Sequence, residues 1–406
     1  MTEQAKVPAI RFAGFTDPWE QRKLGDVASS FDYGLNAAAT EYDGQNKYLR
    51  ITDIDDETHE FSKSDLTTPL ADLAMSADYL LKEGDLLFAR TGASVGKTYL
   101  YRQFDGMVYF AGFLIRARIG EGADPEFAYQ ATLTDAYKKY VAITSQRSGQ
   151  PGVNAQEYAD YQLMLPSKTE QQQIGMTLRS LDDLITLHQR KYDKLVILKK
   201  SMLEKMFPKD GESVPEIRFA GFTDPWEQRK ASEVFQIVDD RGHPTLPVLS
   251  ATQNQGMIYR DDSGRYIGHD ESNEIGYKRV LPGDFVVHLR SFQGGFAHSQ
   301  YEGITSPAYT VFRAKEPTSH SDRFWKHWFM SEHFIAGLST VTYGIRDGRS
   351  ISVDEFMNTF LAFPAVEEQA AISRLFDYLD DLITLHQRKL ELLQNIKKSL
   401  LDKMFV

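Results

Sequence analysis

The sequence predicts an α+β protein in which two tandem α+β domains alternate with two long helices that pair as an antiparallel coiled coil. Three observations predict this fold. Near-identical segments recur about 200 residues apart, two long proline-free segments carry an apolar heptad pattern, and short β-branched and aromatic runs fill the stretches between them. A period of this length indicates a duplicated module, because solenoid repeats span only about 20–50 residues.

The repeat has two parts. Residues 7–23 (VPAIRFAGFTDPWEQRK) and 214–230 (VPEIRFAGFTDPWEQRK) differ at one position, whereas residues 181–191 and 379–389 (both LDDLITLHQRK) are identical. These repeats divide the chain into a first domain (1–165), a first repeat helix (166–207), a second domain with its leading linker (208–363) and a second repeat helix (364–406).

Between the repeats the two copies share only a skeleton, such as GDLLF at 84–88 and GDFVV at 283–287. This pattern favours a common scaffold that carries two different specificities. The alternative is an old duplication that drifts at neutral positions, but drift should not spare one block and scramble the next. The near-identity of residues 7–23 and 214–230 also predicts near-identical DNA, and hence a gene whose variable modules are exchanged by recombination.

The long helices are expected over residues 170–207 and, in the second copy, within residues 364–406, where the helix ends with the chain. Apolar residues are spaced by threes and fours on one seam, which is the pattern of a coiled coil. Thirty-eight residues give a rod of ~57 Å. The seam is expected to include Leu181, Ile185 and His188 in the first copy and Leu379, Ile383 and His386 in the second.

The seam lysines favour antiparallel pairing of the two helices. In-register parallel pairing would place Lys199 beside Lys397, whereas antiparallel pairing places Lys199 near the aromatic Phe376, where its stem can pack. The alternative is that each helix packs only on its own domain. No carboxylate partner is evident for His188 or His386, so no metal site is predicted.

Each domain is expected to be α+β. Strands are predicted at 85–89, 108–118, 285–289 and 309–314, and helices at 124–141 and 321–338. Loops at 90–97, 146–154 and 343–349 are rich in Arg, Gln, Asn, Ser and Gly, which suit base edges and phosphates. The alternative is that they are solvated turns. The candidate DNA-contacting residues are Arg90, Thr91, Ser94, Lys97, Gln146, Arg147, Ser148, Gln150, Arg290, Ser291, Gln293, Tyr343, Arg346 and Arg349.

Composition excludes several classes of protein. The net charge of −11 argues against wholesale coating of nucleic acid but leaves room for local basic patches. The chain has no cysteine, no apolar run approaching the ~20 residues of a membrane helix and no secretory signal at its start, so a cytoplasmic protein is expected.

No catalytic motif is complete. Residues 92–98 (GASVGKT) resemble a P-loop, but only three residues separate the glycines where four are needed. Residues 306–309 (SPAY) differ from the motif of amino-methyltransferases at Ala308. Neither a zinc-binding HExxH nor a GxSxG elbow is present. We therefore expect no catalytic residues, no metal and no cofactor in this chain.

Several segments resemble one known family, the specificity (S) subunits of type I restriction-modification systems. The resemblance rests on YLRITDI at 48–54, GDLLFARTG at 84–92, LPVLSATQNQG at 246–256 and PAVEEQ at 364–369, together with the alternation of domains and helices over nearly the whole chain. The copy at 166–171 (PSKTEQ) departs slightly from the pattern.

The resemblance implies a non-catalytic subunit that binds double-stranded DNA through two target-recognition domains and reads a bipartite, asymmetric site. Its partners would be two modification (methyltransferase) subunits and the restriction (endonuclease and translocase) subunits. S-adenosylmethionine, ATP and Mg²⁺ would bind those partners, and the complex would methylate adenine and cleave DNA in an ATP-dependent manner. From the residues alone, the duplication predicts two half-sites and the divergent fillings predict that they differ.

Two other classes compete with this interpretation. A coiled-coil adaptor with two protein-binding modules would explain the acidic charge but leaves the polar loops without a role. A self-sufficient restriction-methylation enzyme fails because its methyltransferase and nuclease motifs are missing.

Overall fold

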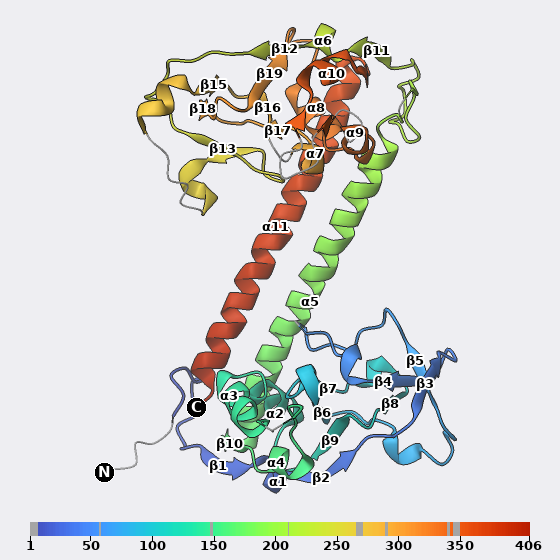
Figure 1. Ribbon diagram of the computed structural model, residues 1–406. Coiled ribbons are helices and arrows are strands. Elements are labelled where there is room, and N and C mark those ends of the chain that lie inside the picture. The colour runs from blue at the N-terminus through green and yellow to red at the C-terminus, as the bar shows by residue number, and fades with distance from the viewer. Residues whose placement is uncertain are drawn as a thin grey trace. The chain divides into compact units, whose positions relative to one another are not determined.

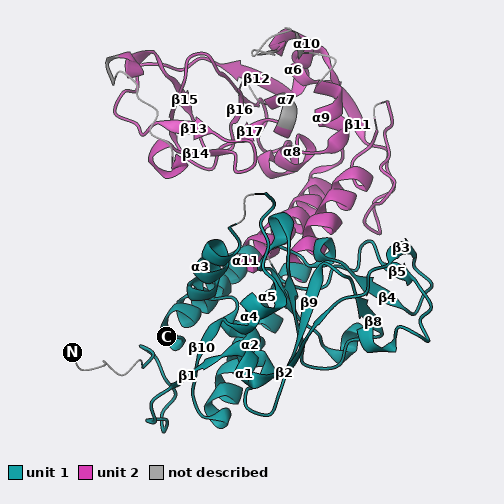
Figure 2. Ribbon diagram, turned by 60° about the horizontal axis from the view of Figure 1, so that its bottom comes forward, with its two compact units in different colours: residues 1–190, 387–406 teal, residues 191–386 magenta. Residues whose placement is uncertain are grey.

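The computed structural model describes residues 7–56, 58–146, 149–209, 211–264, 271–288, 291–338, 342–343 and 350–406. The chain forms two compact units, residues 1–190 with 387–406 and residues 191–386 (Figure 2). Each unit holds one α+β domain and part of both long helices (Figure 1). Among the described helices, none is both long enough and apolar enough to span a bilayer.

The first unit is built on a four-stranded antiparallel sheet in the order β2-β9-β6-β7. Its strands are β2 (Ala28–Tyr33), β9 (Leu114–Ile119), β6 (Asp85–Ala89) and β7 (Thr98–Leu100). Leu86 and Phe88 of β6 lie in one apolar cluster, and Leu87 and Ala89 lie in another, because alternate side chains of a strand point to opposite faces. The strand predicted at 85–89 is confirmed.

Smaller elements complete the first unit. Strand pairs are β1 (Glu20–Lys23) with β10 (Gln162–Leu165), β3 (Ala38–Glu41) with β5 (Thr67–Leu70), and the parallel pair β4 (Lys47–Leu49) with β8 (Val108–Phe110). The helices are α1 (Leu24–Val27), α2 (Pro125–Ala131), α3 (Asp135–Thr144) and α4 (Ala155–Ala159).

The second unit has a sheet of the same strand order, β12-β19-β16-β17, formed by Phe235–Val238, Thr310–Ala314, Phe285–Val287 and Ala297–His298. Its strand pairs are β11 (Glu227–Lys230) with β22 (Phe360–Phe363), β13 (Leu249–Ala251) with β14 (Met257–Tyr259), β15 (Lys278–Val280) with β18 (Gly303–Thr305), and β20 (Thr342–Tyr343) with β21 (Ser350–Ile351). The helices are α6 (Ala231–Val234), α7 (Ser291–Gly294), α8 (Asp322–Trp328), α9 (Glu332–Leu338) and α10 (Val353–Asn358).

Three elements that the sequence predicts as continuous are each divided into two in the structure. The helix expected at 124–141 is two helices, because the Thr134 side chain accepts a hydrogen bond from Tyr137 N and caps a new helix. The helix expected at 321–338 is likewise divided into α8 and α9. The strand expected at 108–118 is divided into β8 and β9 by a turn. Periodicity alone does not reveal such breaks.

One ion pair is common to both sheets. Asp85 and Asp284 are buried at the start of equivalent strands and accept hydrogen bonds from Arg118 (3.2 Å) and Arg313 (2.7 Å) on the neighbouring strand. Burial raises the pKa of both carboxyl groups. The shared Gly-Asp sequence is therefore a structural turn of the scaffold.

The long helices are α5 (Lys168–Lys205) and α11 (Val366–Met404). In the first unit the start of α5 packs on the end of α11, with Ile174, Leu178 and Met404 in one core cluster. In the second unit the last turn of α5 meets the start of α11, where the rings of Phe207 and Phe376 stack at 5.8 Å. Each unit by itself therefore shows antiparallel pairing, as the sequence predicts.

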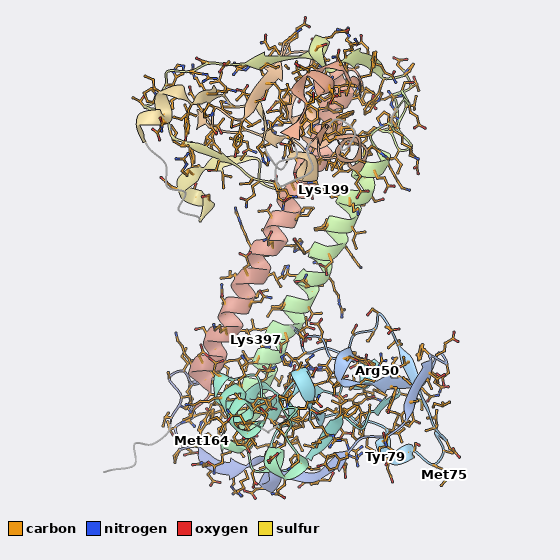
Figure 3. All side chains as sticks on the ribbon, viewed as in Figure 1. Arg50, Met75, Tyr79, Met164, Lys199 and Lys397 are labelled. Carbon is orange, nitrogen blue, oxygen red and sulfur yellow. The ribbon has the colours of Figure 1, made fainter. Side chains whose placement is uncertain are left out.

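The seam lysines bind carboxylates and not aromatic rings. Lys199 forms an ion pair with Asp380 in the second unit, and Lys397 forms the equivalent ion pair with Asp182 in the first (Figure 3). An amine that reaches solvent beyond Phe376, as antiparallel pairing suggested, is thus contradicted, because the Lys199 amine pairs with Asp380. Asp380 lies one helical turn after Phe376 and compensates the charge of a lysine that is only partly exposed.

The repeated segments 7–23 and 214–230 dock in the same way in their own units. Ile10 N donates to Lys403 O and Ile217 N donates to Lys205 O, both at 2.9 Å. Trp19 and Trp226 are buried against Phe127 and Phe324, respectively. Residues 16–18 and 20–22 are nevertheless exposed, so packing does not account for their identity with the second copy.

A buried carboxylate fixes each of these segments. Glu170 is bound by Arg11 Nε and Nη2 (2.7 and 2.8 Å), and Glu368 is bound by Arg218 Nε and Nη2 (both 2.7 Å). The glutamate side chains have exposed fractions of 0% and 1%. The start of each long helix is therefore tied to a repeated segment far away in the sequence.

Replacing Arg218 with methionine should lower the free energy of unfolding of the second unit by about 3–5 kcal/mol, because Glu368 is left buried without its cation. The matched control is Arg229→Met, which removes an exposed pair with Glu227 and should cost less than about 1 kcal/mol. Urea unfolding followed by circular dichroism measures both. Equal effects of the two substitutions would contradict the structural role of the Arg218–Glu368 pair.

Candidate nucleic-acid interface

Two of the predicted loops lie side by side in the first unit. Gly92 N donates to Pro151 O (3.0 Å), and Val153 N donates to Arg90 O (2.9 Å). Gly92 has a positive φ of 72°, and a Cβ added there would lie 2.9 Å from Gln150 Nε2. The structure therefore brings Arg90, Thr91 and Gln150 together, although about sixty residues separate them in the sequence.

Arg90 is held by two aromatic side chains that the sequence analysis did not single out. Its guanidinium carbon lies 5.2 Å from the ring centre of Tyr33 and 5.9 Å from that of Phe113. Both rings are exposed, whereas Arg90 is half-buried and its Nε has no hydrogen-bond partner among the described atoms. An arginine stacked on exposed rings can present its remaining donors to a base edge or a phosphate.

A close backbone contact sets the distance between these rings. Gly34 follows Tyr33, and a Cβ on Gly34 would lie 2.1 Å from Ala111 O, so only glycine permits this approach. Gly112 N then donates to Leu35 O (2.8 Å), which fixes the turn that carries Phe113. A signal for this site was therefore present in the sequence as a glycine after β2, but its partner lies in a distant turn.

A hollow of about 680 Å³ adjoins Arg90 and is lined by the segments around Tyr33, Tyr48 and Phe113. Arg50, on its wall, donates to both oxygens of Asp53 (2.8 and 2.9 Å), which raises the pKa of the arginine. The hydroxyl of Tyr48 donates to Leu35 O (2.7 Å). The segment 48–54 thus forms β4 and a 3₁₀ turn that shape the hollow.

The remaining candidates of the first unit differ in their surroundings. The Lys97 amine donates to Ile54 O (2.9 Å) and pairs with Asp56, and the side chain is only 11% exposed, so it holds the neighbouring loop. Ser94 is half-buried, and Gln146 and Gln150 are exposed. Arg147 and Ser148 lie outside the described residues.

In the second unit most candidates lie outside what the structure describes, namely Arg290, Arg346, Arg349 and the side chains of Gln293 and Tyr343. Ser291 is buried, and its Oγ accepts a hydrogen bond from His288 N (2.8 Å). Tyr343 belongs to strand β20 and not to a loop. In sequence, helix α4 separates the loop at 146–154 from β10, and helix α10 separates the loop at 343–349 from β22.

One group of potential metal ligands occurs among the described residues, namely His327, Asp377 and Asp380 in the second unit. Cationic side chains already compensate these carboxylates. Lys326 binds both aspartates, and Lys199 binds Asp380. We assign this cluster to the joint between α8 and α11, because a divalent cation would add charge where lysines already balance it.

The described residues define a two-domain α+β protein, in which two sheets of the same strand order carry different loops and are attached to long antiparallel helices. Residues 16–196 match the model of the type I restriction modification DNA specificity domain. The chain is 22% identical to the type I restriction enzyme MjaVIII specificity subunit of Methanocaldococcus jannaschii, over 95% of this chain and 92% of that protein. It is 21% identical, with the same coverage, to the putative MjaX specificity subunit of that organism.

The fold agrees with these sequence relationships. The crystal structure of the type I restriction-modification S subunit from M. genitalium superimposes with a TM-score of 0.61 at 11% identity, covering 98% of this chain and 99% of that one. Residues 16–196 thus match the type I restriction modification DNA specificity domain, and over nearly its whole length the chain is similar to type I specificity (S) subunits, as its sequence motifs predict.

The buried His327 should make the second unit sensitive to acid. Burial lowers the pKa of His327 below its ordinary 6.5, although Asp377 accepts a hydrogen bond from its Nε2 (3.1 Å). The unfolded chain then binds the proton more readily, so this contribution to stability is complete above about pH 6.5 and is lost as the pH falls towards the lower pKa of the folded state.

His327→Gln should flatten the fall in unfolding free energy between pH 7 and pH 5. Glutamine can keep the bond to the aspartate, and Gln130 already donates to Asp182 (2.8 Å) at the equivalent place in the first unit. His333→Gln, at a half-exposed histidine of α9, is the control and should leave the slope unchanged. An unaltered slope in His327→Gln would refute this assignment.

Proposed function

We propose that this chain reads a bipartite, asymmetric site in double-stranded DNA, one half with each α+β domain, and holds the modification and restriction subunits of a type I complex. The observation that carries the proposal is the repetition of one sheet order, β2-β9-β6-β7 and β12-β19-β16-β17, under loops that differ in sequence. Equal scaffolds should approach DNA alike, and different loops should select different bases.

In this proposal the chain contributes no catalysis of its own. Adenine methylation would be carried out by two methyltransferase subunits, and ATP-dependent cleavage by the restriction subunits. S-adenosylmethionine, ATP and Mg²⁺ would bind those partners. The paired helices would set the separation of the half-sites, with centres about one helical turn (~10 bp) apart.

Among the candidate DNA contacts, Arg90, Thr91 and Gln150 have the best support, because the structure brings them together around the stacked guanidinium of Arg90. Gln146 is supported by its exposure. Lys97 and Ser291 are already engaged within the protein and would act by shaping their loops. The other members of the predicted set remain proposed contacts, namely Ser94, Arg147, Ser148, Arg290, Gln293, Tyr343, Arg346 and Arg349.

Apolar side chains that are exposed on α5 and α11 support the attachment of two methyltransferase subunits at equivalent places. The first unit exposes Leu187 of α5 and Ile396 of α11, and the second exposes Leu385 of α11 and Leu198 of α5. These two pairs correspond through the 198-residue offset of the repeat. Side chains of this kind are exposed at a cost in water unless a partner covers them, so each unit should bind one methyltransferase subunit.

Arg90→Ala should weaken specific DNA binding by about 1–3 kcal/mol and relax one half-site only, because the other domain is unchanged. Methylome sequencing of a host that carries the gene gives the recognised motif, and gel shifts of the assembled complex give the affinity. Arg22→Ala, an exposed arginine paired with Glu20, is the matched control. Unchanged binding and motif in Arg90→Ala, and in the double variant Arg147→Ala/Arg346→Ala, would reject the loop assignment, and failure of the native complex to bind DNA would favour the adaptor alternative.

Leu187→Glu and Leu385→Glu should each reduce the number of bound methyltransferase subunits from two to one, and the double variant should bind none. A charge at the centre of an apolar contact cannot be hydrated once the partner docks. Native mass spectrometry of the complex measures the stoichiometry, and the unfolding midpoint shows whether the helices still pair. Two subunits retained by the folded double variant would place the attachment surface elsewhere.

A further inference from the structure

Each domain lies on a long helix through one short helix, α2 on α5 in the first unit and α8 on α11 in the second. Part of this contact is the same in both. Gln171 Oε1 accepts a hydrogen bond from Asp124 N (2.8 Å), and Gln369 Oε1 accepts one from Ser321 N (3.0 Å). Asp124 and Ser321 are the N-caps of α2 and α8, so the two contacts can be compared residue by residue.

The two contacts differ in how closely the helices approach. A Cβ at Gly175 would lie 3.0 Å from Phe127 N and 3.1 Å from Glu126 Cβ, so α2 packs directly on the backbone of α5. The equivalent residue of α11 is Ser373, which is buried and donates its hydroxyl to Gln369 O (2.7 Å). A serine under α2 would place its Cβ 3.0 Å from Phe127 N, so the backbone of α2 would have to shift by a few tenths of an ångström.

The two contacts also have opposite charge. In the first unit α2 presents Glu126, which is bound by Arg102 (2.9 Å); burial raises the pKa of this carboxyl group, and the positive charges of Arg102 and of Arg179 on α5 oppose that rise. In the second unit the equivalent residues are reversed, because α8 presents Arg323 and α11 presents Asp377, 3.3 Å apart. Asp377 also accepts from the buried His327.

A domain placed on the other helix would therefore lose both kinds of match. Glu126 would face Asp377, and α2 would meet Ser373. In the reverse exchange, Arg323 would face Arg179 while His327 lost its acceptor. The destabilisation comes mainly from Glu126, which is 12% exposed and would gain a like charge beside it, and from the buried His327, which would lose its acceptor, whereas Arg323 is 70% exposed and would contribute less.

The sequence places the differing residues at a particular boundary. Gly175, Leu178 and Arg179, with their counterparts Ser373, Phe376 and Asp377, all precede the identical segments that begin at Leu181 and Leu379. The part of the helix that touches the domain differs between the copies, and identity begins just beyond it. Asp182 and Asp380 extend the contact into the identical segment, as do Leu181 and Leu379, which pack against the core clusters, and each of these pairs is the same residue type in both copies.

We propose that each recognition domain and the first turns of its helix form one matched unit, which ends at Arg179 in the first copy and at Asp377 in the second, and that only this unit can be exchanged without loss of packing. The inference does not depend on DNA binding. It adds a condition to the exchange of variable modules that the near-identical segments predict, because the start of the helix must accompany the domain.

Two full-length chimeras test the proposal. In the first, residues 24–180 replace residues 231–378, so that the first domain occupies the second position together with its own helix start. In the second, residues 24–165 replace residues 231–363, so that the same domain lies on the native start of α11. The first chimera should unfold within about 2 °C of the native chain, and the second should unfold about 5 °C or more below it, measured by differential scanning calorimetry.

A third chimera identifies the residues responsible. It is the second chimera with Ser373→Gly, Phe376→Leu and Asp377→Arg, and it should recover most of the lost midpoint and the slow amide hydrogen exchange of the transplanted α2. Equal midpoints of the first two chimeras would overturn the proposal, as would a first chimera that does not unfold cooperatively. Absence of recovery in the third would overturn the assignment to these three residues.

Discussion

Two buried carboxylates, Glu170 and Glu368, determine where the rest of each unit can lie. Each sits in the first turn of a long helix, is almost inaccessible to solvent and is bound by both donors of one arginine side chain. A buried carboxylate is costly without such a partner, so the arginine segment must be in place for the helix to begin there. The direction of the helix then fixes the domain that packs on its next turns.

The fixed scaffold leaves the loops free to differ. The Asp85–Arg118 and Asp284–Arg313 pairs hold equivalent strands in both sheets, although the surrounding cores are unlike. The second unit fills its core largely with phenylalanine and tryptophan rings, such as Phe285, Phe312 and Phe329, whereas the first uses Leu86, Ile115 and several tyrosines. Cores tolerate such changes when total volume and pattern are kept. The core side chains can therefore differ between the two units while both sheets hold their loops in the same geometry.

The long helices of this molecule could be predicted from the sequence more accurately than the points at which shorter elements are interrupted or the contacts between side chains. The heptads and the absence of proline placed α5 within about two residues of its bounds, because nothing in the segment competes with a helix. Thr134 divides a predicted helix through a side-chain cap that apolar periodicity does not register. The heptad pattern shows which face of α5 meets α11 but not which residue of α11 lies opposite Lys199. The sequence therefore could not distinguish Phe376 from Asp380 as the partner of Lys199. The ring of Phe113 reaches Arg90 through a distant turn, for which no local pattern exists.

The close approach at Gly175 makes the two helices unequal in their evolutionary history. Glycine inside a helix costs about 0.5–1 kcal/mol of stability relative to alanine, so it is retained where the lack of a side chain is required. Almost any nucleotide change in that codon's first two positions would add a Cβ against the backbone of α2. Position 373 already accommodates a Cβ, because the buried Ser373 fits there with its hydroxyl bonded to Gln369 O. Position 175 in α5 should therefore accumulate fewer substitutions over many generations than position 373 in α11. Sequence differences among descendants of this gene should then appear at position 373 before they appear at position 175.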